Sequence, residues 1–143
     1  MLDAAPPFAT AYLEEALGSV FAEWVRQLEL RLVTAEPGRV VLALPVTARH
    51  IHAGNVMSGQ TLMAAADTAM VLAVMSKLGT FRPMTTVQLQ TTFVRPIAAD
   101  AGEATVTATV LRLGRTMAFG DIRITTGDDD LLAAHATTTY ALL

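Results

Sequence analysis

The chain has 143 residues, of which 52% are hydrophobic and 16% charged, and its 10 basic and 13 acidic residues give a formal net charge of −3. A chain of this length is typical of one domain and buries about two thirds of its unfolded surface, so its core needs no disulfide or metal staple. The lack of cysteine excludes disulfides, thiolate metal sites and cysteine nucleophiles. The mild acidity and the dispersed arginines argue against nucleic acid as a partner.

The first residues carry no basic side chain before Arg26, which argues against a secretory signal or a transit peptide and predicts a cytoplasmic protein. We expect one domain over residues 1–143, with residues 1–27 as a helical segment packed on it. Residues 9–26 repeat apolar side chains every three or four positions, which predicts a helix that follows Pro6 and Pro7. The apolar stripe of this helix consists of Leu13, Ala16, Leu17, Val20, Phe21, Trp24 and Val25.

The apolar period then changes from 3.6 to 2, which indicates strands. Residues 28–32 and 40–44 alternate apolar and polar side chains on either side of a turn at 36–38, so they are expected to form a hairpin. After a polar loop at 50–57, Ser58 and Gly59 open a long helix that runs to about Leu78 and ends at Gly79. Four further strands are predicted: one from Pro83 to Arg95, then 104–111, 117–126 and 131–142.

Short turns between successive strands predict an antiparallel sheet, and strands that follow one another without a helix exclude a doubly wound parallel sheet. The predicted fold class is therefore α+β, with about six antiparallel strands wrapped around one long central helix and an N-terminal helix beside it. The segment 59–78 is apolar enough to raise the question of a membrane span. Asp67, several polar residues and many alanines favour a buried helix of a soluble protein and no membrane partner. The high mean hydropathy, +0.45, predicts a buried subunit interface.

Asp67 is the one formal charge between Arg49 and Lys77. The helix around it has almost no polar face, which predicts that it is enclosed on all sides. A carboxylate there costs several kcal/mol unless it is hydrogen-bonded, paired or protonated. The sequence leaves two interpretations open: Asp67 bonds backbone amides or an arginine for structural reasons, or it is catalytic.

The start of the same helix supports the catalytic interpretation. Gly59 lies in the first turn, where amide hydrogens lack partners within the helix and can polarise a carbonyl or thioester oxygen. Gly59 and Asp67 are eight residues apart, which separates them by about 12 Å along a helix. If both act on one substrate, they must come from two chains whose helices run antiparallel across a twofold axis. The hypothesis predicts an obligate dimer with two sites at its interface.

Four segments in order resemble the hotdog-fold acyl-CoA thioesterases of the phenylacetate-pathway (PaaI-like) type. Residues 58–69 resemble the family's His-Gly-Gly-(x)6-Asp-Thr-Ala signature, and residues 85–96 resemble a strand that ends in Phe-x-Arg-Pro. Residues 111–115 resemble the family's Arg-x-Gly-Arg turn, and residues 133–140 its closing strand. The resemblance covers roughly residues 28–142. It implies a hotdog fold, hydrolysis of an acyl-CoA, and assembly as a dimer or a dimer of dimers.

The resemblance also implies roles for particular residues. Asp67 is expected to act as nucleophile or general base, Gly59 to offer its amide to the thioester oxygen, and Thr86 to help hold the water or the carboxylate. Ser58 and Gln60 replace the motif histidine and second glycine, and we expect both to contact substrate. The family has an asparagine in the loop before this helix, and His52 occupies that position in this chain. Asn55 takes the position instead if the loop is shifted.

Arg95, Arg112 and Arg115 are expected to bind the phosphates of coenzyme A through forked hydrogen bonds. No cofactor is expected beyond the coenzyme A of the substrate. A metal site at His50, His52 and Asp67 lacks a clear further ligand, and a triad through Ser58 lacks the Gly-x-Ser-x-Gly elbow.

Two other functions remain open. One is hydration or dehydration of an acyl thioester, although Leu72 stands where the hydratase-type pattern has histidine. The other is non-catalytic binding or sensing of acyl-CoA.

Overall fold

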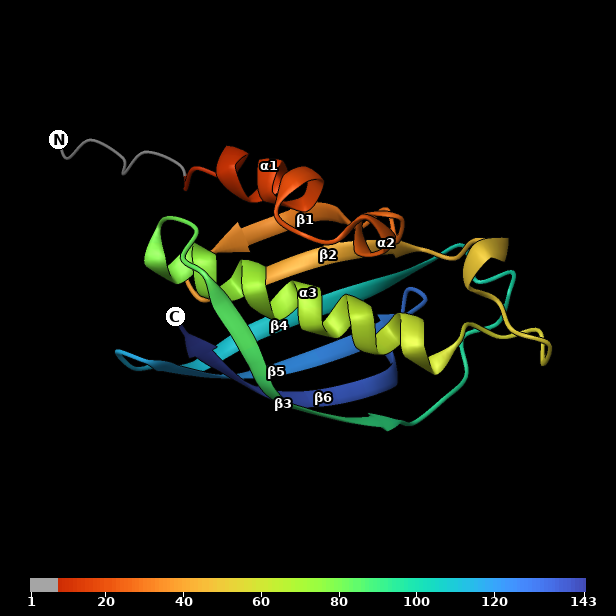
Figure 1. The fold of residues 1–143 in the computed structure, drawn as a ribbon. Coiled ribbons are helices and arrows are strands. Elements are labelled where there is room, and N and C mark those ends of the chain that lie inside the picture. Colours follow the sequence, from red (N-terminus) through yellow and green to blue (C-terminus); the bar gives the residue numbers. More distant parts are fainter. Residues whose placement is uncertain (1–7) are drawn as a thin grey trace, which may run out of the picture.

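The computed structural model describes residues 8–143, so the predicted role of Pro6 and Pro7 lies outside the described residues. One antiparallel sheet curves around a long helix, and two short helices lie on the other side of that helix (Figure 1). The helices are α1 (Ala11–Ser19), α2 (Glu23–Arg26), the 3-10 turn η1 (Ala48–His50) and α3 (Gly59–Leu78). The strands are β1 (Arg31–Glu36), β2 (Arg39–Pro45), β3 (Met84–Phe93), β4 (Glu103–Leu113), β5 (Met117–Thr126) and β6 (Leu131–Leu142).

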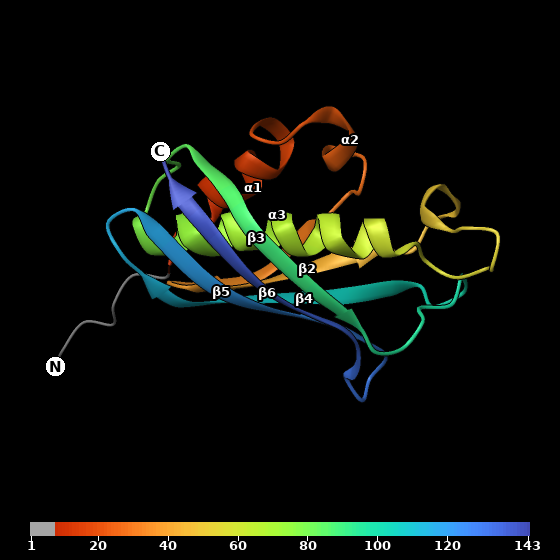
Figure 2. The same ribbon diagram turned by 60° about the horizontal axis from the view of Figure 1, so that its bottom comes forward.

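The sheet has the strand order β1-β2-β4-β5-β6-β3, and every neighbouring pair is antiparallel. The strand β3 follows α3 in the chain but lies at the far edge of the sheet, beside β6 (Figure 2). The chain leaves β2, the second strand from one edge, and passes through α3 to β3 at the opposite edge, so the sheet wraps α3. This arrangement confirms the predicted α+β hotdog fold.

The bounds of α3 follow from residues at its two ends. Ser58 is its N-cap, and its hydroxyl oxygen accepts a hydrogen bond from the backbone N–H of Thr61 at 3.2 Å. Gly79 ends the helix in the left-handed conformation, with φ of 81°, and donates its N–H to the Met75 carbonyl. The helix is long and apolar enough to cross a membrane, but most of it is buried inside the fold. It is a core helix rather than a span, and the cytoplasmic location stays a prediction.

The prediction that α3 is enclosed on all sides is wrong for the single chain. Gln60 is exposed, and Met63, Ala64 and Asp67 are partly exposed. Their spacing of three and four residues puts them on one face of the helix. We call these four residues the open face of α3. Gln60 and Asp67 are polar, but the methionine and alanine between them are not, so the sequence pattern did not mark this face as open.

The N-terminal prediction also needs correction. The single helix predicted over 9–26 is broken into α1 and α2, and Trp24 is 61% exposed although it was placed on the apolar stripe. Leu13 is buried, and the Tyr12 hydroxyl donates a hydrogen bond to the Met75 carbonyl at 3.2 Å, so α1 packs on α3. The first strand begins at Arg31 rather than near 28, because Glu29 takes a left-handed conformation with φ of 58° that interrupts extended backbone.

Candidate active site

The Asp67 carboxylate lies on the open face of α3 and accepts hydrogen bonds from two hydroxyl groups. Thr86 on β3 donates to it, with its Oγ1 2.9 Å and 3.2 Å from the two carboxylate oxygens. Tyr140 on β6 also contacts the carboxylate, and its hydroxyl lies 3.0 Å from the Asp67 backbone carbonyl oxygen. Thr86 and Tyr140 are paired across the two strands, which explains why both reach the same turn of α3. Within residues 8–143, neither an arginine nor a backbone amide bonds this carboxylate, so the expected structural partners are not the ones found.

Tyr140 was missed as a site residue in the sequence, although residues 133–140 resemble a family strand. Burial raises the pKa of its hydroxyl above the ordinary value, and the negative charge of Asp67 raises it further. Tyr140 therefore keeps its hydrogen and remains a donor. The available signal was the two-residue period of β6, which puts Tyr140 on the same buried face as Thr138 and Leu142.

Gly59 occupies the first position of α3, where the backbone amides have no partner within the helix. The positive end of the helix dipole adds to the pull of these N–H groups on a negative or polarised oxygen. A Cβ on Gly59 would lie 3.2 Å from the ring of Phe93, so a side chain at this position would press against that ring. The amide end of α3 is thus suited to bind a carbonyl oxygen that approaches the backbone closely.

Ser58 lies beside this amide end but serves the helix itself. Its hydroxyl oxygen accepts from the Thr61 N–H and lies 2.7 Å from the Thr61 hydroxyl oxygen, so its hydrogen-bonding capacity is largely used inside the chain. Gln60, in contrast, is exposed on the open face. Of the two predicted substrate contacts at the motif departures, only Gln60 makes no side-chain hydrogen bond within residues 8–143.

The two groups proposed to act together stay apart in one chain. Gly59 and Asp67 belong to the same helix, so about 12 Å of helix rise separates them. The structure places Thr86 beside Asp67. The first turn of α3, which holds the free amides, contains no acidic residue.

His52 and Asn55 lie in the loop before α3 and are both exposed. The His52 Nδ1 accepts a hydrogen bond from the Gly54 N–H at 2.8 Å, which fixes the ring inside its own loop. Asn55 takes a left-handed conformation with φ of 63°, and its carbonyl accepts from the Ala99 N–H at 3.3 Å. Neither side chain hydrogen-bonds Gly59 or Asp67 in the described part of the chain.

The three arginines predicted to bind phosphate lie in two places. Arg95 donates to the Leu132 carbonyl at 3.1 Å, near the amide end of α3. Arg112 and Arg115 line a surface hollow of about 330 Å³ at the β4–β5 hairpin. The Arg82 guanidinium, just beyond the other end of α3, donates to the Arg115 carbonyl at 3.4 Å and so holds this hairpin near the helix C-terminus. In one chain, Arg112 and Arg115 therefore lie at the opposite end of α3 from Gly59.

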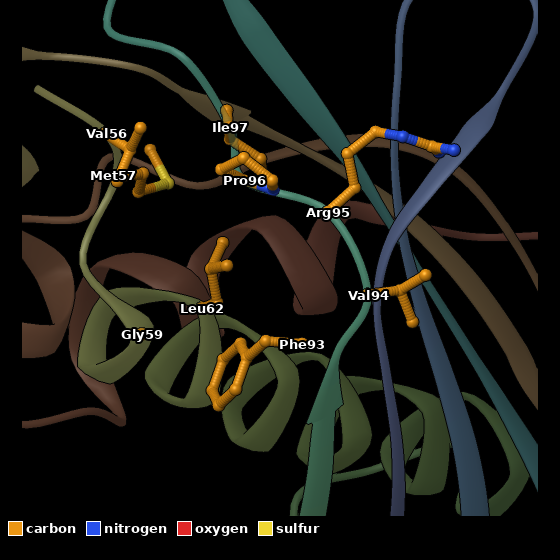
Figure 3. A pocket seen from close by; sticks show the side chains of 9 residues that line it. All are labelled: Val56, Met57, Gly59, Leu62, Phe93, Val94, Arg95, Pro96 and Ile97. Carbon is orange, nitrogen blue, oxygen red and sulfur yellow. The ribbon is translucent and has the colours of Figure 1, made fainter.

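A second hollow, of about 270 Å³, adjoins Gly59 (Figure 3). It lies between the amide end of α3, the end of β3 and the segment that follows β3. Its lining residues are Val56, Met57, Gly59, Leu62, Phe93, Val94, Arg95, Pro96 and Ile97. No group of three or more potential metal ligands gathers anywhere in residues 8–143.

Comparison with known proteins assigns the family. The model of the Thioesterase superfamily matches residues 49–133, which include α3, β3, β4 and β5. A candidate esterase of Thermoplasma acidophilum is 27% identical over 128 residues, covering 88% of this chain and 95% of that protein. The structure of mouse thioesterase superfamily member 2 superposes with a TM-score of 0.81 at 26% identity, over 94% of this chain and 97% of the mouse chain.

The phenylacetic acid degradation protein PaaI of Thermus thermophilus, solved as an Asn-to-Asp mutant, has a TM-score of 0.74 at 25% identity. The match covers 85% of this chain and all of the PaaI chain, 100%. The family match, the fold and these relatives agree with one another on the family. The chain belongs to the Thioesterase superfamily and is a hotdog-fold, PaaI-like thioester hydrolase.

Proposed function

We propose that the protein hydrolyses acyl-CoA thioesters to a free acid and coenzyme A, at a site shared between two copies of the chain. The observation that carries this proposal is the Asp67 carboxylate, which two hydroxyl groups orient on the open face of a helix whose free amides lie about 12 Å away. A carboxylate and an oxyanion donor are the two groups that thioester hydrolysis needs, and two copies bring them together.

Assembly through α3 and β3 accounts for the exposed surface around Asp67. In the described part of the chain, β3 is an edge strand, and no other strand pairs with its outer side, so a second β3 can bond the backbone groups there. Val87 is 58% exposed on that strand, an unfavourable position for a large apolar side chain in an isolated chain. A twofold axis beside β3 pairs the two strands antiparallel and lays the open faces of both α3 helices together. Gly59 of each chain then lies beside Asp67 of the other.

In this site, the thioester carbonyl oxygen binds the Gly59 amide, which stabilises the negative charge that develops on the oxygen. Asp67 of the other chain then acts in one of two ways. As a general base, it takes a proton from a water molecule whose oxygen attacks the carbonyl carbon. As a nucleophile, it attacks the carbon itself, and water hydrolyses the resulting anhydride. In both cases the carbon–sulfur bond breaks, and the thiolate leaves and is protonated.

The β4–β5 hairpin suits the nucleotide end of coenzyme A in the same dimer. Arg112 and Arg115 lie near the C-terminal end of α3, and in an antiparallel pair this end points past the Gly59 of the other chain. The pantetheine arm then spans from the thioester to these guanidinium groups, which bind phosphate through charge-assisted hydrogen bonds. Arg95 contributes less, because it is engaged with the Leu132 carbonyl.

Release of free thiol from a panel of acyl-CoAs, followed with a thiol reagent, tests the proposal. We expect turnover that saturates with substrate. Binding of acyl-CoA without thiol release would instead support the non-catalytic sensor, and release of an enoyl or hydroxyacyl product without free thiol would support a hydratase or dehydratase. Neither binding nor turnover would contradict all three functions.

Replacing Tyr140 with phenylalanine is expected to lower kcat about tenfold, because it removes one hydrogen bond to a charged carboxylate and lets Asp67 turn away from the substrate. KM should change much less, since Tyr140 is buried, with 3% of its surface exposed, and so offers the substrate little surface to bind. Steady-state kinetics, which gives kcat and KM separately, checks this prediction. The matched control is Tyr12→Phe, which removes a tyrosine hydrogen bond to the other end of α3 and should leave kcat unchanged. An equal loss in both variants would assign the effect to stability.

A further inference from the structure

We infer that Thr138 is a positioning residue for thioester hydrolysis, because its hydroxyl fixes an irregular part of β3 that directs Thr86 toward Asp67. This inference rests on the proposed function, in which the Thr86 hydroxyl orients the Asp67 carboxylate. Thr138 is 4% exposed and lies on β6, the strand beside β3 (Figure 2). Within residues 8–143 it hydrogen-bonds neither Thr86 nor Asp67, so it acts through the backbone of β3.

The strand β3 contains one residue more than the stretch of β6 with which it pairs. Thr86 pairs with Tyr140 across the two strands. Two residues further along β3, Gln88 pairs with Thr139, which is only one residue away from Tyr140. Val87 is therefore the extra residue of a β-bulge, a feature that changes the direction in which neighbouring side chains point.

The bulge puts Thr86 and Leu89 on the same face of the sheet. In a regular strand, residues three apart point to opposite faces. The β6 partner of Leu89 is Thr138. Thr138 and Tyr140 are two residues apart on β6 and are both buried, and the Tyr140 hydroxyl contacts α3, so both side chains face α3. Thr86 and Leu89, which pair with them, therefore face α3 as well.

A regular β3 would serve only one of two purposes. With Leu89 packed on the core beneath α3, Thr86 would turn to the outer face of the sheet and lose Asp67. With Thr86 kept at Asp67, Leu89 and Phe93 would turn outward. The Phe93 ring lies against the Gly59 backbone, 3.2 Å from where a Cβ would stand. The bulge thus lets one strand support both ends of the site.

The Thr138 hydroxyl secures this bulge. It donates a hydrogen bond to the Gln88 carbonyl oxygen at 2.7 Å, directly after the extra residue Val87. A bulge disrupts the ladder of backbone hydrogen bonds locally, so a side-chain donor at this point stabilises a backbone that the ladder supports less well. Threonine is β-branched and has few side-chain conformations in a strand, which keeps the hydroxyl directed at this carbonyl.

Replacing Thr138 with valine removes the hydroxyl and keeps the shape of the side chain. A methyl group then lies against the Gln88 carbonyl oxygen, which has to turn to another donor or to water. We expect the bulge to shift and Thr86 to leave Asp67, which lowers kcat about threefold to tenfold. KM should change less than about twofold, because Thr138 is buried and offers the substrate little surface. Thr138→Ser keeps the hydroxyl and should restore kcat.

A double-mutant cycle measures whether Thr138 acts through Thr86. Thr86→Val alone should lower kcat about tenfold, because it removes one hydrogen bond to a charged carboxylate. If Thr138 acts only by directing Thr86, the chain that carries both Thr86→Val and Thr138→Val should have the same kcat as Thr86→Val. Losses that multiply, to about thirtyfold or more, would overturn the inference, because Thr138 would then act independently of Thr86.

Ser76→Ala is the matched control for the loss of a buried hydroxyl. Ser76 is 2% exposed near the other end of α3, donates to the Ala73 carbonyl at 2.6 Å and accepts from the Gly38 N–H at 2.9 Å. This variant should unfold at a lower temperature than the wild type and keep its kcat. An equal loss of kcat in Ser76→Ala and Thr138→Val would mean that lost stability alone lowers turnover, and it would contradict the inference.

Crystal structures of the wild type, Thr138→Val and Thr138→Ser separate this inference from the proposed function. The Thr86 hydroxyl should lie within hydrogen-bond distance of Asp67 in the wild type and in Thr138→Ser, but not in Thr138→Val. If Thr86 leaves Asp67 in Thr138→Val but the wild type releases no thiol, the proposed function fails and the positioning of Thr86 by Thr138 stands. If the wild type releases thiol but Thr86 stays at Asp67 in Thr138→Val, the inference fails and the function stands.

Discussion

Replacing Asp67 with asparagine is expected to lower kcat at least about a hundredfold while acyl-CoA binding is largely kept. The amide has nearly the shape of the carboxylate, and its one oxygen still accepts a hydrogen bond from Thr86 or Tyr140. It cannot take a proton from water or attack a carbonyl carbon, so the loss falls on the chemical step. Thiol release gives kcat, and calorimetry with the same acyl-CoA gives the affinity.

The control for this substitution is Asp128→Asn, which removes a carboxylate from the exposed turn between β5 and β6 and should leave both quantities unchanged. Thermal unfolding of both variants checks that the fold is intact. Undiminished turnover by a folded Asp67→Asn protein would refute the assigned role of Asp67.

Replacing Gly59 with proline is expected to lower kcat about a hundredfold to a thousandfold relative to Gly59→Ala, because proline lacks the N–H that is to stabilise the oxyanion. The helix should tolerate this change. Proline is favoured at the first position of a helix, and Ser58 before it already has φ of −67° and ψ of 145°, which the residue before a proline prefers.

The comparison with alanine isolates the hydrogen bond. Both side chains place a Cβ about 3.2 Å from the Phe93 ring, so both displace that partly exposed ring, but alanine keeps the amide. Circular dichroism should give the same helix content for the two variants. Equal kcat values for Gly59→Pro and Gly59→Ala would mean that another group binds the thioester oxygen.

The parts of the fold that the sequence predicts well are those whose signals are local. The bounds of α3 follow from Ser58 and Gly79, because a cap acts within one turn of the helix. The two-residue period of the later strands and their short turns likewise predict antiparallel neighbours, and the observed pairing of β4, β5 and β6 confirms this. The break between α1 and α2 was missed because the apolar stripe continues through it.

The parts that escape prediction depend on contacts between distant residues. Tyr140 reaches Asp67 across 73 residues, and only the wrapping of the sheet around α3 brings them together. Ser58 has a role that its place in the motif did not indicate. Its hydroxyl caps α3 and bonds Thr61, and the predicted substrate contact stays a prediction. The separation of Gly59 from Asp67 was predictable, because helix rise alone fixes it.

Coexpression of Asp67→Asn and Gly59→Pro chains tests the shared site most directly. Each variant alone should be nearly inactive, but a hybrid dimer contains one site with an intact Gly59 from one chain and an intact Asp67 from the other. Random pairing makes half of the dimers hybrid with one working site of two, so activity should return to about a quarter of the wild-type level. If hybrid dimers form and activity stays at the level of the separate variants, each site lies within one chain and the account is wrong.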